Sequence, residues 1–489
     1  MSRADALILG SSPNALAAAA RLAKGGSRVV VLDTRAAVGG PVATEEFAPG
    51  FRADVGVMSA SLDPEIARDL GIAVEVIHRE SVTAIGAENV TLRAAPGLGK
   101  AFDSAVELLR ALYMRQPPDM PVASPADVAL LGDLAARLRG LGERGMHEVL
   151  RLSFMSARDF FTEQVGSERV RALLAGAAVR CLSEGPFAAG TLFGFLHHTA
   201  TGDALFRSSA RGGLGKLVEA LAAAARAAGA EVRTGVPGPL RVEIEDGVAR
   251  GARLGDGTTI GAERVVSDYD ARTTFTELVS PTELDPDTNR AIRSLRYRGA
   301  VARVHLALKE LPERAGLDPD ALGGTLVVAP DVASIERAWD QAKRGAASSP
   351  PYVEATLPTL RDPTLAPDGR HVLDAWVQYV PYGRGDRSAV LQSVLAALAP
   401  LSPNLERSVL HSHVSLPEDL ERRFGLAEGH LYGGEIRLDQ AFFLRPLPGY
   451  ARHETPIANL YLCGSATHPG GYSGRSGWNL AGRLLSTTG

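Results

Sequence analysis

The sequence contains very little cysteine, with Cys181 and Cys463 the only two among its 489 residues. They lie far apart in the chain and form no C-x-x-C pair, which argues against a disulfide framework, a thiol redox pair and a zinc site. So few cysteines are typical of a protein from a reducing compartment, and we expect a cytoplasmic location.

Long apolar runs and an excess of one charge are also missing. No apolar stretch approaches the roughly 20 residues that a membrane-spanning helix needs, so any membrane contact is expected to be peripheral, at the membrane surface. Lys and Arg number 52 against 56 Asp and Glu, and the formal net charge of -4 gives no attraction to nucleic acid. We find no G-x-S-x-G motif, no paired catalytic carboxylates and no metal-ligand spacing of histidines, so we expect neither covalent nor metal catalysis.

The N-terminal 33 residues, by contrast, predict a β–α–β unit. Residues 6–9 and 29–32 are short apolar runs typical of buried strands, and the alanine-rich stretch 14–24 favours a helix. Gly10 stands at the tight turn before the helix, and Asp33 follows the second strand, where an acidic side chain accepts from a ribose hydroxyl. This order predicts a dinucleotide-binding unit, with an ordinary β–α–β unit without a ligand as the alternative.

The loop of this unit departs from the G-x-G-x-x-G fingerprint at two positions. Ser12 replaces the second glycine, where the backbone approaches a pyrophosphate, and Ala15 replaces the third, where a small side chain lets helix and strand pack closely. The N–H groups and the positive dipole of the helix start favour a phosphate, and the Ser12 hydroxyl can donate to one as well. We therefore expect Gly10, Ser12, Asn14 and Ala15 to lie at the cofactor.

Three further stretches carry a resemblance to a known family. Residues 33–56 place the pair Gly39-Gly40 six residues after Asp33, and residues 210–235 predict a Gly-rich turn, a helix and a strand. Residues 434–481 read GEIRLDQAFFLRPLPGYARHETPIANLYLCGSATHPGGYSGRSGWNLA. In this order the three stretches resemble the phytoene desaturase-like flavoproteins, and most closely the branch of pyridine nucleotide-disulphide oxidoreductase domain-containing proteins.

The resemblance implies FAD as the cofactor and an α/β fold, in which a discontinuous, Rossmann-like FAD-binding domain carries a second, α+β substrate domain. The FAD-binding domain is expected at residues 1–90, 206–285 and 425–489, and the substrate or cap domain at residues 91–205 and 286–424. Within the second domain, the hydrophobic patterns predict helices over residues 103–205 and strands at residues 297–308 and 372–380.

The resemblance also implies where FAD lies. Its pyrophosphate and ribityl chain would follow the segment after Asp33, the backbone of Val236 would touch the adenine, and the C-terminal turn would meet the isoalloxazine ring. The helix that starts near Ser476 would place positive dipole beside the reduced ring. The expected cofactor-binding residues are Gly10, Ser12, Asn14, Ala15, Asp33, Gly39, Gly40, Val236, Gly464, Ser465, Gly471, Ser473 and Gly474.

The C-terminal turn departs from the family pattern where we place the candidate catalytic residues His468, Tyr472 and Arg475. The turn is one residue shorter, and Tyr472 and Arg475 stand where small apolar residues are common. Arg475 either faces the flavin, where it would raise the reduction potential, or is a solvated turn residue. His468 either positions the substrate or the flavin edge, or stabilises the turn by hydrogen bonds.

The family resemblance implies an FAD-dependent oxidoreductase of desaturase, dehydrogenase, saturase or isomerase type. Its substrate would be a small lipophilic molecule, of isoprenoid or polyene type, that passes hydride from a C–C bond to flavin N5, with oxygen, a quinone or NAD(P) as candidate electron acceptors. A flavin amine oxidase-like enzyme is one alternative. A binding protein on the same fold with a decayed cofactor site, similar to Rab-GDP dissociation inhibitors that hold a prenyl tail, is the other.

Overall fold

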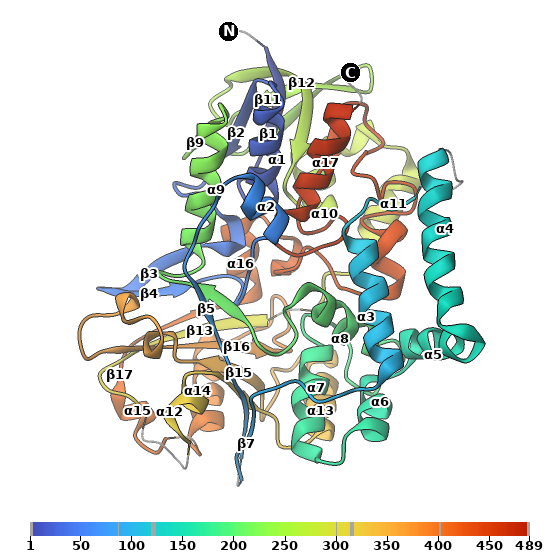
Figure 1. Cartoon of the computed structure of the whole chain (residues 1–489). Coiled ribbons are helices and arrows are strands. Elements are labelled where there is room, and N and C mark those ends of the chain that lie inside the picture. Colours follow the sequence, from blue (N-terminus) through green and yellow to red (C-terminus); the bar gives the residue numbers. More distant parts are fainter. Residues whose placement is uncertain are drawn as a thin grey trace.

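Two seven-stranded sheets organise the chain in the computed structural model, which describes residues 3–86, 88–118, 124–299, 301–312, 317–400 and 402–486. Figure 1 shows one sheet near the N- and C-termini and the other at the opposite end of the molecule. None of the helices in these described ranges combines the length and the apolar character that crossing a bilayer requires.

The first sheet has the strand order β10-β11-β12-β1-β2-β9, and β18 pairs with β12. Its strands are β1 (Ala4–Leu9), β2 (Val29–Asp33), β9 (Glu231–Thr234), β10 (Arg241–Glu245), β11 (Val248–Arg253), β12 (Thr259–Ser267) and β18 (Leu460–Leu462). The five strands β9, β2, β1, β12 and β18 run parallel, and they come from the start, the middle and the end of the chain. Their carboxyl ends therefore meet at one edge, where open α/β sheets bind ligands.

Three helices pack on one face of this sheet (Figure 1). They are α1 (Pro13–Lys24), α9 (Gly215–Ala227) and α17 (Arg475–Ser486), and α1 contacts both of the others. Small residues allow close contact, because a Cβ at Gly477 of α17 would lie 1.8 Å from the carbonyl oxygen of Asn14 in α1. The N-terminal β–α–β unit predicted from the sequence is confirmed.

The second sheet has the order β17-β13-β16-β15-β14-β6-β7. Its strands are β6 (Val82–Ile85), β7 (Val90–Leu92), β13 (Val301–Leu308), β14 (Thr325–Val328), β15 (Tyr352–Thr356), β16 (His371–Gln378) and β17 (Val409–Ser415). The two strands predicted for a second sheet are confirmed as β13 and β16, which pair antiparallel. The domain boundaries stay a prediction; β6, inside the expected first segment, pairs with β14 of the second sheet.

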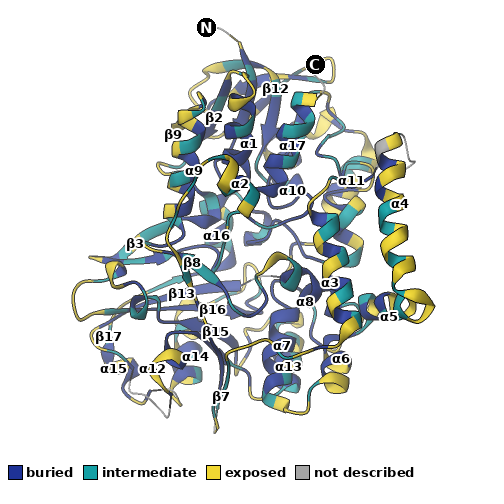
Figure 2. Cartoon of the chain, in the orientation of Figure 1, coloured by how far each residue is buried: buried dark blue, intermediate teal, exposed yellow. Residues whose placement is uncertain are grey.

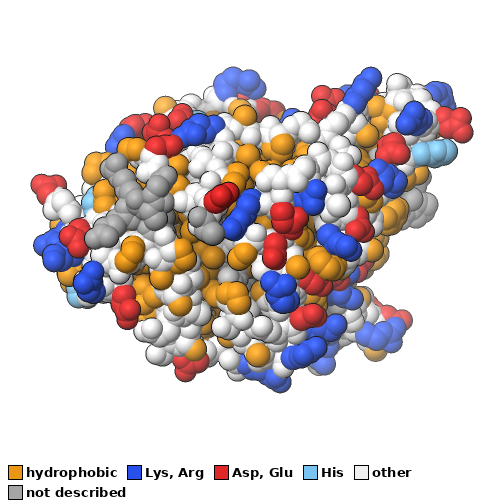
Figure 3. All heavy atoms as spheres, turned by 90° about the horizontal axis from the view of Figure 1, so that it is seen from below, with side chains coloured by type: hydrophobic (Ala, Val, Ile, Leu, Met, Phe, Trp, Pro, Cys, Tyr) orange, Lys and Arg blue, Asp and Glu red, His pale blue; other side chains and the backbone are white. Residues whose placement is uncertain are grey.

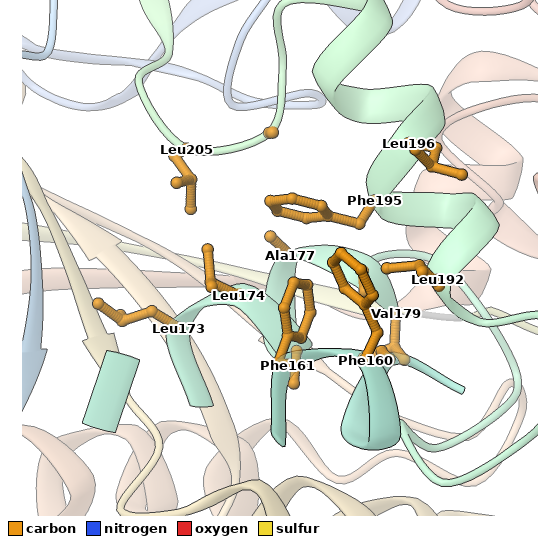
Figure 4. Packing of buried hydrophobic residues seen from close by; sticks show 14 of the residues in the cluster. Phe160, Phe161, Leu173, Leu174, Ala177, Val179, Leu192, Phe195, Leu196 and Leu205 are labelled. Atoms are coloured by element: carbon orange, nitrogen blue, oxygen red, sulfur yellow. The ribbon is translucent and has the colours of Figure 1, made fainter. Parts of the chain in front are cut away.

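A helical layer lies beside the second sheet, as the pattern of residues 103–205 predicts. It consists of α3 (Lys100–Tyr113), α4 (Pro125–Gly140), α5 (Gly142–Phe154), α6 (Ala157–Gln164), α7 (Glu168–Ala178) and α8 (Leu192–Thr201). Phe160, Phe161 and Phe195 meet at its centre, with the rings of Phe161 and Phe195 5.1 Å apart and edge to face (Figure 4). Figure 2 shows the outlying helix α4 largely exposed, whereas α7 and α8 are mostly buried.

The surface seen in Figure 3 mixes the two signs of charge, with Lys, Arg, Asp and Glu interspersed rather than gathered by sign. This agrees with the near balance of 52 basic and 56 acidic residues. Electrostatic steering by a large patch of one sign is therefore not a feature of this face.

Candidate cofactor and substrate site

The loop between β1 and α1 has the geometry of a nucleotide-binding turn. Gly10 has φ +103°, a conformation that favours glycine, and its amide donates to the carbonyl oxygen of Leu32 at 2.8 Å. A Cβ at this position would lie 2.7 Å from Cβ of Asp268. Only glycine therefore fits between the end of β1 and the segment that follows β12.

The start of α1 binds a carboxyl group. Ser12 is the N-cap residue of this helix, and its hydroxyl accepts from the Asn14 amide at 3.2 Å. The Ser12 amide donates to Oδ2 of Asp268 at 2.7 Å, and the Ser12 hydroxyl donates to Oδ1 at 2.6 Å. The donors available at this helix start thus suit an anion such as a pyrophosphate.

Asp33 lies at the end of β2, where the sequence places a ribose-binding carboxylate. Its Oδ1 accepts from the Arg35 amide at 2.8 Å, and its Oδ2 accepts from the Ser11 hydroxyl. The Gly39 amide in turn donates to the carbonyl oxygen of Ser11 at 3.0 Å, with φ +124° at Gly39. Ser11, which sequence reasoning missed, therefore joins Asp33 to the Gly39-Gly40 turn.

A cavity of about 320 Å³, here named the nucleotide cavity, lies over these residues. Its lining comes from the start, the middle and the end of the chain and includes Gly10, Ser12, Asp33, Gly40, Leu240, Asp268, Ser465 and Tyr472. A Cβ at Gly464 would lie 2.1 Å from the carbonyl oxygen of Asp268, the residue that also limits the space at Gly10. The N-terminal loop and the C-terminal turn therefore meet at one point, as the sequence motifs predict.

Other predicted cofactor residues support the turn or lie beside it. The Asn14 side-chain amide donates to the carbonyl oxygen of Gly471 at 2.9 Å, and Ala15 is fully buried in the helix packing. The Val236 amide donates to the carbonyl oxygen of Asp33 at 3.2 Å, and Gly238, Pro239 and Leu240 contribute the cavity lining in this segment. The contact between Val236 and an adenine stays a prediction.

A second cavity of about 440 Å³, here named the substrate cavity, adjoins the first. Tyr472 lines both cavities. Its buried hydroxyl donates to the carbonyl oxygen of Leu431 at 2.6 Å and accepts from Ser465 Oγ at 3.2 Å. Gly471 and Ser473 border the same cavity, and Gly474 adopts φ +84° against Ala17. Tyr472 is thus held rigidly at the boundary of the two cavities.

His468 lies outside the described lining of both cavities. Its Nε2 is 3.2 Å from the carbonyl oxygen of Leu112 and 3.1 Å from that of Arg115, at the end of α3. Its ring meets Tyr113 edge-on, and burial lowers its pKa to about 4, so the side chain is neutral at pH 7. This geometry favours the turn-stabilising interpretation of His468 over contact with a substrate.

Arg475 lies at the rim of the substrate cavity, where acidic residues hold its guanidinium. Its Nε donates to Asp63 at 3.0 Å, and its Nη2 donates to Glu65 at 2.9 Å. Both carboxylates belong to the start of α2 (Pro64–Asp69), of which Asp63 is the N-cap. The ion pairs therefore tie the C-terminal turn to α2.

We expect Arg475→Ala to lower the free energy of unfolding by about 1–2 kcal/mol, because two partly buried carboxylates lose a charged donor. The flavin midpoint potential should change little, because these carboxylates already neutralise the guanidinium. Denaturant unfolding and a redox titration measure the two effects. Arg68→Ala, which removes an exposed arginine of α2, is the control. A clear fall of the potential in Arg475→Ala alone would show that Arg475 faces the ring.

Several residues of the substrate cavity carry no signal in the sequence. His197 and His198 both line it, and the Tyr113 hydroxyl is 2.8 Å from Nδ1 of His197. Burial lowers the pKa of both histidines well below the ordinary value. Asp203 accepts from the Tyr432 hydroxyl at 2.8 Å, and its Oδ1 has no hydrogen-bond partner among the described residues.

The fold and the paired cavities define a flavin-dependent oxidoreductase. The residues fit FAD, because the Ser12 amide and hydroxyl at the start of α1 donate to a carboxyl group where a pyrophosphate would lie. A family model described as flavin containing amine oxidoreductase matches residues 16–484, and the chain belongs to this family. The predicted cofactor, FAD, and the prediction of an enzyme rather than a binding protein with a decayed site are confirmed.

Similar proteins cover almost the whole chain. Pyridine nucleotide-disulfide oxidoreductase domain-containing protein 2 of Rattus norvegicus is 29% identical over 98% of this chain and 92% of its own length. A neurosporene-forming phytoene desaturase of Cereibacter sphaeroides is 26% identical over 95% of this chain and 91% of its own. A solved putrescine oxidase with bound putrescine shares the fold, with a TM-score of 0.60, 18% identity and coverage of 100% of this chain and 99% of its own. The predicted family resemblance and the Rossmann-like α/β fold are thus confirmed.

Proposed function

We propose that this FAD-dependent oxidoreductase acts on a C–C bond of a hydrophobic substrate of isoprenoid or polyene type, as a desaturase, dehydrogenase, saturase or isomerase. Bound FAD supplies the hydride acceptor at its N5 atom. The single observation that carries the proposal is the substrate cavity, which meets the nucleotide cavity at Tyr472 and is bordered by apolar and aromatic side chains. The phytoene desaturase among the similar proteins supports the same class of substrate.

Apolar and aromatic side chains form much of the substrate cavity. They are Ala60, Leu62, Pro64, Tyr113, Met114, Ala200, Tyr432, Pro469 and Tyr472. A volume of about 440 Å³ is in the usual range for a ligand pocket, and it suits a molecule of moderate size or one segment of a longer chain. In this role the protein orients the reacting carbons and excludes water, and needs no nucleophile of its own.

The charged and titratable groups of this cavity are mostly engaged with the protein itself. Arg475 is paired with Asp63, and the Arg110 guanidinium donates to the carbonyl oxygens of Thr199 and Ala200. Lowered pKa values keep His197 and His198 neutral at pH 7. The cavity can therefore take an apolar molecule without leaving a charge buried and unpaired.

Amine oxidation is the second candidate, and Asp203 is the observation that favours it. Asp203 lines the substrate cavity with Tyr432 and His198; its buried Oδ1 has no hydrogen-bond partner among the described residues, and its Oδ2 lies 3.8 Å from Nη1 of Arg180. A carboxylate beside aromatic rings suits an ammonium group. The putrescine oxidase of similar fold supports this candidate at the level of the fold alone.

Anaerobic reduction of the FAD-loaded protein separates the two candidates. We expect the visible flavin bands to bleach on addition of a polyene or a shorter isoprenoid, with a rate that saturates with substrate concentration. Bleaching by putrescine or another primary amine, without bleaching by the isoprenoids, would favour amine oxidation instead. Adding oxygen, a quinone or NAD(P)⁺ separately to the bleached protein then identifies the electron acceptor by the rate at which the bands return.

Filling the substrate cavity should block turnover without loss of FAD. Ala200 lies on α8 and lines this cavity, so we expect Ala200→Phe to slow substrate-dependent bleaching at least about tenfold, because the larger ring occupies the binding space. Stopped-flow absorbance measures the rate, and the flavin-to-protein absorbance ratio measures the FAD content.

The matched control is Ala223→Phe, which makes the same change at an exposed position of α9. This variant should keep both the rate and the FAD content of the wild type. Equal rates in the two variants would show that the substrate binds elsewhere.

A further inference from the structure

Asp268 places its carboxylate on the two donors that a pyrophosphate needs. The Ser12 amide and hydroxyl donate to its two oxygens at 2.7 Å and 2.6 Å. In a dinucleotide-binding loop, the backbone N–H groups of this position face the pyrophosphate of the cofactor. The side chain of Asp268 therefore occupies the binding position of the most highly charged part of FAD.

The backbone of Asp268 has little freedom to move away. Its amide donates to the carbonyl oxygen of Leu9 at 2.9 Å, directly after β12. Gly10 and Gly464 pack closely against it. A Cβ at Gly10 would lie 2.7 Å from Cβ of Asp268, and a Cβ at Gly464 would lie 2.1 Å from the Asp268 carbonyl oxygen. When FAD binds, the carboxyl group must therefore rotate or share the Ser12 donors with the phosphate.

Sharing of the Ser12 donors between an ionised Asp268 and the phosphate is unfavourable, because two negative charges then meet in a buried site. It becomes favourable when the Asp268 carboxyl group carries a proton. The pKa of Asp268 is raised to about 7: burial is the largest cause, the hydrogen bonds from Ser12 lower the pKa, the charge of Asp33 raises it and the charge of Arg35 lowers it. Other titratable groups near Asp268 include Tyr269, Cys463 and Tyr472, and Glu277 lines the same cavity; burial is the largest cause of the raised pKa of each. A second negative charge from FAD would raise the pKa of Asp268 again.

We propose that Asp268 competes with the FAD pyrophosphate for the Ser12 amide and hydroxyl, so that this chain binds FAD tightly when Asp268 is protonated and releases it more readily when Asp268 is ionised. The inference concerns the cofactor site alone and does not depend on the substrate. It makes Asp268 a determinant of FAD affinity that responds to pH in the neutral range.

The test follows FAD release from the full-length holoenzyme on dilution. Flavin fluorescence, which rises as FAD leaves the protein, gives the dissociation constant at pH 6.0, 7.0 and 8.5. For the wild type we expect the constant to rise at least about tenfold from pH 6.0 to pH 8.5, because each pH unit above the pKa reduces the protonated fraction about tenfold. A constant that does not rise over this range would overturn the proposal without use of any variant.

Asp268→Asn keeps the shape of the side chain and removes its charge. We expect this variant to hold FAD at least about tenfold more tightly than the wild type at pH 8.5, with a dissociation constant that is nearly independent of pH. Glu263→Gln is the matched control, because it removes a carboxylate in the same way at an exposed position of β12 outside the lining of this cavity. It should keep the pH dependence of the wild type.

The remaining outcomes contradict the proposal. Equal or weaker FAD binding by Asp268→Asn at pH 8.5 would show that the carboxylate supports the cofactor. A wild-type pH dependence in Asp268→Asn would assign the titration to another group, and loss of that dependence in Glu263→Gln would assign it to the overall charge of the protein.

Discussion

Gly10→Val is expected to abolish FAD uptake. The backbone of Gly10 has φ +103°, which a β-branched residue adopts only with strain, and its Cβ would lie 2.7 Å from Cβ of Asp268. Both effects displace the loop whose amides face the cofactor. The purified variant should lack the two visible flavin bands that we expect of the wild type, and added FAD should not restore them.

Gly26→Val is the matched control for backbone strain. Gly26 has φ +91° in the turn after α1, and a Cβ there would meet no atom within 4 Å. This variant should lose some stability and keep its FAD. Full FAD content in Gly10→Val would show that the loop after β1 does not contact the cofactor.

Glu354→Ala is expected to lower the free energy of unfolding by about 3–5 kcal/mol, because it removes the ion-pair partner of buried Arg207 and leaves buried Arg180 with Asp203 alone. The Glu354 carboxylate accepts from Tyr352 at 2.7 Å, from Arg180 at 3.4 Å and from Arg207. The side chains of both arginines are at most 3% exposed. Chemical denaturation of the holoenzyme measures the loss through the unfolding midpoint and slope.

The control for this prediction breaks an ion pair on the surface. Glu219→Ala removes the partner of Lys216, an i,i+3 pair with a distance of 2.6 Å and side chains about half exposed. Its cost should stay near zero to 0.5 kcal/mol, because solvent screens the pair. A similar small loss in Glu354→Ala would show that water or a rearranged side chain compensates the buried arginines.

Local patterns in the sequence predict much of the fold. The apolar runs around Gly10 give the first β–α–β unit, and the helices α3 to α8 occupy most of residues 103–205, where the hydrophobic pattern predicts helices. Asp33 also lies where its position after a strand suggests. These features depend on residues that are neighbours in the chain, and helix propensity and hydrophobic periodicity are properties of such local stretches.

The parts that the sequence did not predict depend on distant contacts. Asp268 meets Ser12 across 256 residues, and His468 meets the end of α3 across more than 350. The turn motif indicates that His468 has a specific role, but only the position of α3 shows that His468 forms hydrogen bonds with carbonyl oxygens at the end of that helix. The lining of the substrate cavity likewise combines α2, α3, α8 and the C-terminal turn, which no local pattern relates.

The packing of α17 on α1 has a consequence for synthesis of the protein on the ribosome. The first helix emerges early, while its partner and strand β18 are translated more than 400 residues later. At ordinary elongation rates of roughly 5–20 residues per second, α1 waits on the order of tens of seconds for this contact. The nascent chain therefore exposes an apolar helix face for most of translation, which makes early chaperone binding favourable, and it can complete its flavin site only when the last turn has left the exit tunnel.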